Sequence, residues 1–307
     1  MLTRRRFIGT TLVAGATLAT GAHQARPQPA SKRTTIDAQV HLWKANSPDW
    51  PWDPGVTPQL PEPFTIERAL PMMDEAGVDR VVIVPPSWEG DRNDYALEAV
   101  RRYPTRFAVM GRISLTEPKT AEQFPDWKQQ PGMVGIRVTF HPPQWKWLSD
   151  GTVDWFWPAA EKYQLPVMFY GAPMANFARV AERHPQLPMI ADHLGVTGDI
   201  VKQGRLTEAV KETAALAKYP NVSVKLSTTP FYSAESYPFR DMTVHIRRLF
   251  DAFGPRRCYW GTDLTNSFNK ASYKQRITQF TETLDFLSDS DKEWVMGRAI
   301  LEKLGWA

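Results

Sequence analysis

The sequence predicts an α/β protein, a (β/α)8 TIM barrel in a single domain, preceded by an N-terminal signal segment. Three observations carry this prediction. Short β-branched runs alternate with amphipathic windows of helical period. Eight such runs can be counted along the chain. Polar or charged residues stand at the ends of most runs, where a parallel barrel places its functional groups.

The eight runs are predicted to be strands because they are short, apolar and rich in β-branched residues. In chain order they are TTIDAQVHLW (34–43), DRVVIVPP (79–86), RFAVMGRIS (106–114), GMVGIRVTF (132–140), LPVMFY (165–170), LPMIADH (187–193), NVSVKLS (221–227) and RCYWGTD (257–263). Amphipathic windows between them predict helices at 65–77, 93–104, 153–164, 175–185, 206–220 and 243–254. The link 115–131 has no clear pattern, and 273–306 predicts two or three closing helices.

The alternative fold is a doubly wound parallel sheet. It is disfavoured because no glycine-rich phosphate loop follows the first predicted strand. The chain has 307 residues, of which 42% are hydrophobic, and that is sufficient for a large core. Its one cysteine, Cys258, cannot form an internal disulfide.

The net charge of +4 does not indicate nucleic-acid binding. Residues 1–33 contain six basic residues and no acidic residue, so removing them leaves a charge of −2 on residues 34–307. No basic stripe and no DNA- or RNA-binding motif is present in that part. The partner that we expect is therefore a small molecule.

The basic N-terminus predicts a targeting segment. Residues 1–33 are interpreted as a twin-arginine signal peptide and linker, because Thr3-Arg4-Arg5-Arg6-Phe7-Ile8 precedes a short apolar run and small residues. Cleavage is expected after Ala22. The run is too short and too rich in glycine and alanine for a stable membrane anchor. We therefore expect the twin-arginine export machinery as a partner and a periplasmic or secreted location.

The barrel rule selects the residues at the carboxyl ends of the strands as site candidates. Burying several charges together is costly unless they pair or serve a site, so their convergence indicates a functional cavity. The candidates are Gln39, His41, Arg112, Arg137, His141, Tyr170, His193, Lys225 and Asp263. Asp192 is expected to face away from the cavity, because neighbouring side chains on a strand alternate.

Five strand-end motifs resemble one enzyme family. IDAQVHLW, GIRV, ADHLG, VSVKLS and WGTDLT occur in that order within residues 34–307. They resemble the amidohydrolase-related (amidohydrolase 2) family of the metal-dependent hydrolase superfamily. The resemblance is strongest to the branch with 2-pyrone-4,6-dicarboxylate lactonase and L-fuconolactonase. It implies a hydrolase that opens a small acidic lactone with an activated water.

The resemblance also raises the question of a metal. Metal-using members hold a divalent ion with two histidines of strand one, a histidine of strand six and an aspartate of strand eight, often with a histidine of strand five. This chain has Gln39 at the first position and Tyr170 at the end of strand five. No cofactor is favoured. The alternative is one zinc or manganese ion held by His41, His193 and Asp263.

The resemblance implies roles for the catalytic candidates. Asp263 would take a proton from water, as a positioned carboxylate can. His41 and His193 would polarise the lactone carbonyl, with help from Gln39.

The remaining candidates are assigned to substrate binding. Arg112, Arg137 and Lys225 would hold an acidic group of the substrate, because guanidinium groups bind carboxylates and sulfonates well. Tyr170 and His141 would form hydrogen bonds to the substrate.

Two further functions stay open: a metal-dependent amidohydrolase or decarboxylase of the same superfamily, and a barrel that binds a ligand without turnover. The substrate and the oligomeric state are not predicted.

Overall fold

The structure is a computed structural model that describes residues 33–306. The predicted signal segment, residues 1–33, lies outside the described residues except for Arg33. Among the described residues, no helix is long and apolar enough to cross a membrane.

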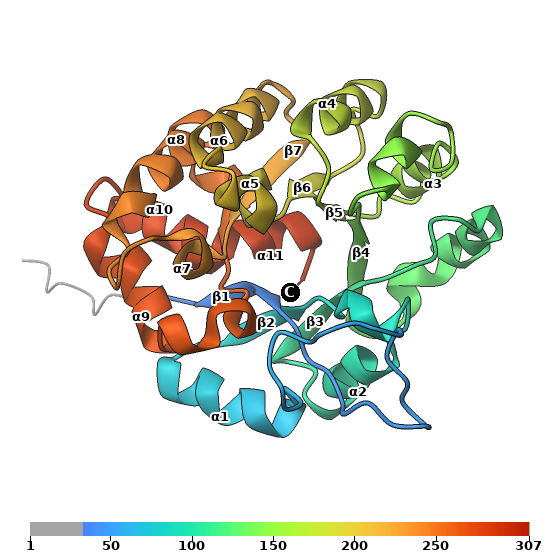
Figure 1. The fold of residues 1–307 in the computed structure, drawn as a ribbon, viewed down its shortest axis with the longest axis horizontal. Helices are drawn as coiled ribbons and strands as arrows, with labels where there is room; N and C mark the ends of the chain where they lie inside the picture. The colour runs from blue at the N-terminus through green and yellow to red at the C-terminus, as the bar shows by residue number, and fades with distance from the viewer. Residues whose placement is uncertain (1–32, 307) are drawn as a thin grey trace, which may run out of the picture. The chain divides into compact units, whose positions relative to one another are not determined.

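All eight predicted strands are present, and they form one parallel sheet in the order β1 to β8 (Figure 1). The barrel prediction is therefore confirmed. The strands are β1 (Ile36–Val40), β2 (Arg80–Ile83), β3 (Phe107–Gly111), β4 (Met133–Thr139), β5 (Val167–Tyr170), β6 (Met189–Ala191), β7 (Val222–Leu226) and β8 (Cys258–Trp260). β8 returns to β1 at the carboxyl end, where the Asp263 N–H donates to the Gln39 carbonyl at 2.9 Å.

Helices follow the strands and surround the sheet (Figure 1). The α-helices are α1 (Ile66–Ala76), α2 (Asp94–Arg102), α3 (Phe156–Lys162), α4 (Met174–Arg183), α5 (Gly198–Lys202), α6 (Leu206–Ala215), α7 (Thr229–Tyr232), α8 (Thr243–Phe253), α9 (Tyr273–Thr278), α10 (Asp289–Glu293) and α11 (Ala299–Leu304). The link 115–131, which showed no pattern, contains the 3-10 segment η2 (Pro118–Gln129). Its Trp127 indole N–H donates to the Gly135 carbonyl at 2.9 Å, which fixes the segment against β4.

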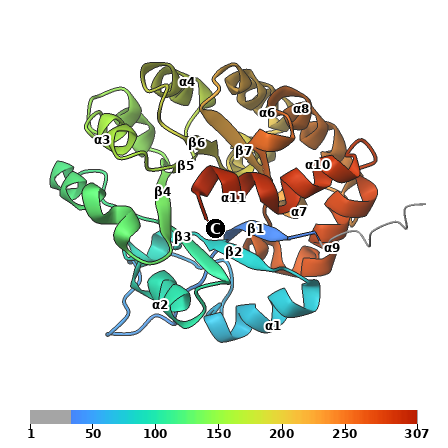
Figure 2. The ribbon, with the colours of Figure 1, turned by 180° about the vertical axis from the view of Figure 1, so that it is seen from behind.

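The interior of the barrel is apolar at its amino end. Ile36, Ala38, Val82, Ala108, Met168, Ile190 and Tyr259 pack there with residues of α11 and of the π-helical segment η10 (Trp294–Arg298). Figure 2 shows α11 lying across this end of the barrel. A Cβ at Gly297 would stand 2.4 Å from the Thr34 carbonyl oxygen, so only glycine allows this approach. The closed amino end leaves the carboxyl end as the entrance to the barrel.

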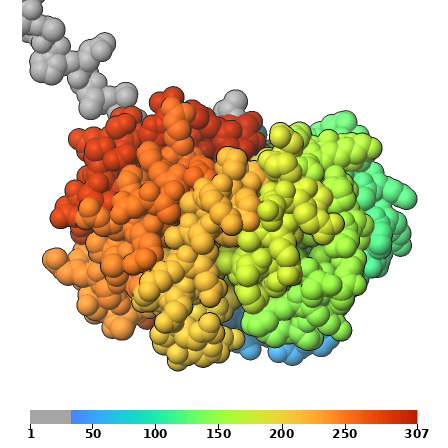
Figure 3. Space-filling model, turned by 90° about the horizontal axis from the view of Figure 1, so that it is seen from above, coloured from blue at the N-terminus to red at the C-terminus, as the bar shows by residue number. Residues whose placement is uncertain are grey.

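The outer core lies between the strands and the surrounding helices. Its members include Val40, Val81, Ile136, Phe169, Val224 and Leu249, all of them buried. Figure 3 shows that segments consecutive in the chain lie side by side around the outside of the barrel. Side chains alternate along each strand between the barrel interior and this outer core. Only the inward-facing side chains of a strand can therefore reach the site.

Candidate active site

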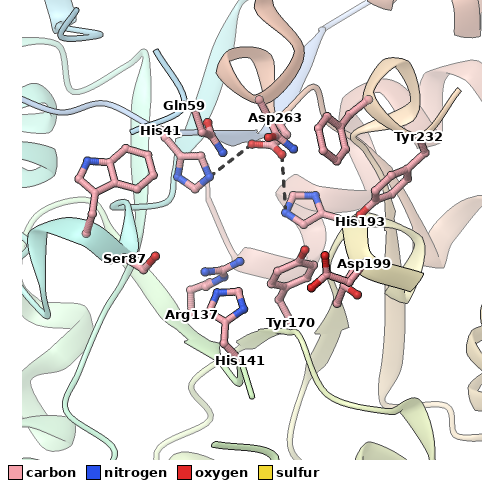
Figure 4. A pocket seen from close by; sticks show the side chains of 15 residues that line it. His41, Gln59, Ser87, Arg137, His141, Tyr170, His193, Asp199, Tyr232 and Asp263 are labelled. Atoms are coloured by element: carbon pink, nitrogen blue, oxygen red, sulfur yellow. Dashed lines mark ion pairs between the residues drawn. The ribbon is translucent and has the colours of Figure 1, made fainter. Parts of the chain in front are cut away.

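A cavity of about 300 Å³ opens at the carboxyl ends of the strands. Six of the nine predicted site residues line it: His41, Arg137, His141, Tyr170, His193 and Asp263 (Figure 4). The other three, Gln39, Lys225 and Arg112, do not border it. Ser87, Asp199 and Tyr232 are further polar lining residues.

One carboxylate oxygen of Asp263 accepts a hydrogen bond, and the other is buried without one. Asp263 follows β8 and its backbone is left-handed, with a φ of 50°. The Thr228 hydroxyl donates to Oδ2 at 3.2 Å. Oδ1 is buried and accepts no hydrogen bond from any described residue, although His41 Nε2 lies 3.3 Å from it. A carboxylate oxygen without a hydrogen bond, on a residue that lines a polar cavity, can accept a proton from water.

His193 supports Asp263 through Thr228. The Thr228 hydroxyl gives its proton to the carboxylate, so its oxygen accepts one from His193 Nδ1 at 2.6 Å. Ser227 Oγ lies 2.9 Å from the same nitrogen. This network assigns the Nδ1–H tautomer to His193, and its Nε2 lone pair faces Asp263 Oδ2 at 4.0 Å. Figure 4 shows His41 and His193 both directed at the carboxylate.

Backbone strain is concentrated at this centre. His193, Thr228 and Asp263 follow β6, β7 and β8, and their φ angles are 52°, 68° and 50°. Left-handed backbone is uncommon for residues other than glycine and is strained for a β-branched residue such as threonine. Strain of this kind persists where tertiary structure imposes it and clusters at functional sites. Three adjacent strand ends sharing it mark this as a functional centre.

His41 is also fixed by hydrogen bonds. Its Nδ1 lies 2.6 Å from the Val84 carbonyl, which can only accept, so Nδ1 carries a proton. Its Nε2 lies 3.3 Å from the Gln39 side-chain nitrogen. Gln39 Oε1 accepts a short hydrogen bond from Lys225, so that nitrogen is the amide donor. His41 therefore receives a hydrogen bond at Nε2 and is a neutral imidazole.

Asp192 lies inside the barrel, and the expectation that it faces away is wrong. Its Oδ1 is 2.7 Å from Lys225 Nζ, and its Oδ2 is 3.2 Å from Arg137 Nε. Ile190 points into the barrel, so alternation turns Asp192 inward as well. The left-handed backbone of His193 then breaks the alternation, so the His193 side chain also points toward the entrance of the barrel.

Gln39 and Lys225 lie beneath the cavity rather than on its wall. Both side chains are completely buried, and they contact each other. The β1–β2 register shifts between Asp37 and Val40, and this irregularity brings both Ala38 and Gln39 to the inner side. A substrate in the cavity cannot touch either residue without a rearrangement of the barrel floor.

Arg112 lies beside the cavity without a direct ion pair among the described residues, although Asp91 and Asp53 act on it electrostatically at longer range. No carboxylate of the described residues is within 4.0 Å of it, and its Nε has no hydrogen-bond partner. Its Nη1 lies 3.4 Å from the Thr139 hydroxyl, which also accepts from Arg137. Burial and the Arg137 charge lower the pKa of Arg112 to about 10. Arg112 and Arg137 both border a smaller hollow of about 140 Å³ next to the main cavity.

Burial by itself would raise the pKa of Asp263, but the contacts with His193, His41 and Thr228 lower it below its ordinary value. Burial lowers the pKa of His193 to about 4. Burial also raises the pKa of Tyr170 to about 12, so its hydroxyl keeps its proton. At neutral pH the centre therefore contains a carboxylate, a neutral His193 and a phenol donor.

These pKa values predict how activity depends on pH. Asp263 must be ionised to accept a proton, and a lowered pKa keeps it ionised in weak acid. We expect kcat/KM to stay level from about pH 8 to about pH 6 and to fall only as the pH approaches the His193 value of about 4. Initial rates of acid release would measure this. An acid limb near neutral pH would instead assign the base to a histidine.

Sequence reasoning missed two residues of this centre and misplaced a third. Thr228 links His193 to Asp263, and Tyr232 lines the cavity with its hydroxyl donating to the Val196 carbonyl at 2.5 Å. Asp192 was noticed but placed on the wrong side. The polar run after strand seven, KLSTT, was the available signal for Thr228, but its left-handed backbone is not visible in sequence.

Fold and site together define the class of protein. A (β/α)8 barrel with a buried carboxylate and two imidazoles at its carboxyl end is a barrel enzyme of the hydrolase type. The chain belongs to the amidohydrolase family, whose family model matches residues 36–302. The family that the strand-end motifs suggested is thereby confirmed.

The chain is similar to known lactone-acting enzymes. It is 26% identical over 236 residues to an L-fucono-1,5-lactonase of Burkholderia ambifaria, covering 74% of this chain and 79% of that protein. It is 28% identical over 214 residues to a 4-sulfomuconolactone hydrolase of Hydrogenophaga intermedia, covering 67% of each. A Burkholderia multivorans amidohydrolase solved with bound zinc shares the fold, with a TM-score of 0.75 at 18% identity over 89% of this chain and 99% of that one.

Because that neighbour holds zinc, the donor set of this chain must be compared with a metal site. His41, His193 and Asp263 are the available donors, and the Gln39 amide N–H points at His41 Nε2. Within residues 33–306, no group of three or more His, Cys, Asp or Glu is arranged to hold a metal ion. Zinc and manganese prefer imidazole and carboxylate ligands over the amide and phenol found at Gln39 and Tyr170. The residues present do not fit a metal.

Proposed function

We propose that this protein is a hydrolase that opens a small acidic lactone with a water activated by Asp263. The observation that carries the proposal is the asymmetry of the Asp263 carboxylate. Thr228 holds Oδ2, whereas the buried Oδ1 has no hydrogen-bond donor among the described residues, and Asp263 lines the cavity. The lactone-acting relatives support the same bond type.

The reaction needs one proton to move twice. Water gives a proton to Asp263 Oδ1 while its oxygen bonds to the lactone carbonyl carbon. The ring C–O bond then breaks, and the proton returns to the departing ring oxygen. His41 and His193 present no N–H at Nε2 in the assigned tautomers, so they can accept a hydrogen bond from the water but cannot donate one to the lactone carbonyl. The donors left for the carbonyl are Arg137 and Tyr170, which both line the cavity.

Charge favours an acidic substrate. Asp192 forms ion pairs with both Arg137 and Lys225 and so balances one of these two charges, and Asp263 acts electrostatically on Lys225. Arg112 then remains beside the cavity with no direct ion pair, and only Asp91 and Asp53 act on it at longer range. Burying it is costly without an anion, so a carboxylate or sulfonate of the substrate is the matching partner.

Hydrolysis of a panel of lactones tests the function. We expect turnover of lactones that carry a carboxylate or sulfonate, measured as acid release in a weakly buffered indicator assay. Neutral lactones of the same ring size should react poorly. Binding of acidic lactones without any hydrolysis would overturn the proposal and favour a ligand-binding barrel.

Arg112→Met is expected to raise KM for an acidic lactone by about 10- to 100-fold, since a hydrogen bond to a charged group contributes about 1.5–3 kcal/mol. A neutral lactone of the same size should lose little. Steady-state kinetics on both substrates measure the difference. Arg101→Met, at an exposed position with no contact to the cavity, is the control. Equal losses on both lactones would mean that Arg112 supports the fold rather than the acid group.

The basic N-terminus supports a second part of the proposal, namely export through the twin-arginine route to the periplasm or beyond. The motif Thr3-Arg4-Arg5-Arg6-Phe7-Ile8 is its basis. Cell fractionation of the wild type and of an Arg4→Lys/Arg5→Lys variant tests it. Wild-type protein that stays in the cytoplasm would refute export.

A further inference from the structure

The barrel floor contains a buried network of interacting side chains whose inner members, Asp192, Lys225 and Gln39, do not line the cavity. It runs from Arg137 to Asp192, Lys225, Gln39 and His41. Lys225 Nζ forms an ion pair with Asp192 Oδ1 at 2.7 Å and donates hydrogen bonds to the Ala38 carbonyl at 3.3 Å, to Met168 Sδ at 3.1 Å and to Gln39 Oε1. Three hydrogen-bond acceptors match the three N–H bonds of an ammonium, and the Asp192 carboxylate, which opposes the lowering of the Lys225 pKa by burial, supplies the counter-charge of a charged Lys225.

This arrangement decides which way the Gln39 amide faces. An ammonium can only donate, so it takes the amide oxygen and turns the NH2 group toward His41. We infer that Lys225 and Gln39 together replace a metal ion at this site: Lys225 supplies a fixed positive charge, and Gln39 places an N–H against the His41 Nε2 lone pair that a metal would need.

The charges agree with this inference. Arg137, Lys225, Asp192 and Asp263 carry two positive and two negative charges around the two neutral imidazoles. The Lys225 charge also acts electrostatically on His193 and Asp263. A divalent cation beside Asp263 would leave two uncompensated positive charges in a buried region, which is strongly unfavourable. The centre is balanced by its own side chains.

The inference assigns Gln39 and Lys225 as positioning residues. They act on the reacting atoms through His41, which contacts Asp263 Oδ1 at 3.3 Å. The sequence alone suggested that both residues bind substrate, but their complete burial excludes direct contact with a ligand in the cavity.

The first test reads the His41 tautomer in the wild-type chain without substrate. Long-range ¹H–¹⁵N NMR spectra of histidine-labelled protein distinguish the two neutral tautomers, and His41→Asn assigns the signal. We expect the Nδ1–H tautomer at neutral pH, unchanged when zinc is added. An Nε2–H tautomer, or a zinc-dependent shift of the His41 nitrogen, would overturn the inference.

The second test rebuilds the metal site. Zinc affinity is measured by calorimetry for the wild type, Gln39→His and Gln39→His/Lys225→Met. We expect the double variant to bind zinc at least about tenfold more tightly than the wild type. The zinc affinity of Gln39→His alone should lie between those of the wild type and the double variant, because the new imidazole of the single variant still faces the Lys225 ammonium. Circular dichroism and thermal melting establish that each variant is folded, and an unfolded variant leaves the decision to the NMR test.

A wild-type chain that retains about one zinc per molecule through dialysis, and loses it in His41→Asn, would refute the inference. A folded double variant with the wild-type zinc affinity would refute it as well. Neither readout involves a lactone. Failure here therefore leaves the proposed hydrolase function standing, and failure to hydrolyse lactones leaves this inference untouched.

Discussion

Asp263→Asn is expected to lower kcat for an acidic lactone by about 10²- to 10⁴-fold, the usual contribution of a general base. Asparagine has nearly the same shape and can still accept the hydrogen bond that Thr228 donates to Oδ2. It cannot take a proton from water at the position of Oδ1. Since substrate contacts are retained, KM should change little. Steady-state kinetics with the best lactone of the panel measure both constants.

Asp285→Asn is the matched control for this substitution. Asp285 is exposed, lies outside the cavity, and undergoes the same chemical change. We expect wild-type kinetics from the control and an unchanged unfolding temperature from both proteins. If Asp263→Asn keeps kcat within about tenfold of wild type, the proton acceptor is another group and the proposed mechanism is wrong.

Asp192→Ala is expected to destabilise the fold by about 3–5 kcal/mol, the usual cost of leaving a buried ion without its partner. Two buried cations, Arg137 and Lys225, lose their shared carboxylate in this variant. Denaturant unfolding followed by tryptophan fluorescence measures the free energy of unfolding. Asp251→Ala is the control, because its ion pair with Arg247 is exposed and should contribute less than about 1 kcal/mol.

A double variant separates the ion pair from the packing. Asp192→Ala/Lys225→Met removes one of the two unpaired cations, so we expect it to be less destabilised than the sum of the single substitutions. If Asp192→Ala costs no more than Asp251→Ala, the buried pairs contribute nothing to folding, and the charged chain beneath the cavity is not a structural element.

Much of the fold could be predicted from periodicity alone. The apolar runs matched all eight strands, because buried parallel strands need continuous hydrophobic residues. The segment 115–131 could not be assigned, because a 3-10 segment held by one tryptophan hydrogen bond has no periodic signature. The signal segment stays a prediction.

The candidate site was predicted less completely. Strand-end position brought His41, Arg137, His141, Tyr170, His193 and Asp263 to one cavity, as the barrel rule expects. The same rule could not distinguish cavity wall from barrel floor, where Gln39 and Lys225 lie. Side-chain depth depends on the register between strands, and no single strand contains that information.

The sequence by itself determined the class of fold, the family and the set of polar groups at the strand ends. Only the tertiary structure decided which way those groups face. The register shift in β1 turns Gln39 inward, and the left-handed backbones of His193 and Asp263 bring their side chains to the entrance. Both features depart from strand alternation, and contacts between distant segments impose them. Local sequence patterns therefore named the residues, whereas long-range packing assigned their roles.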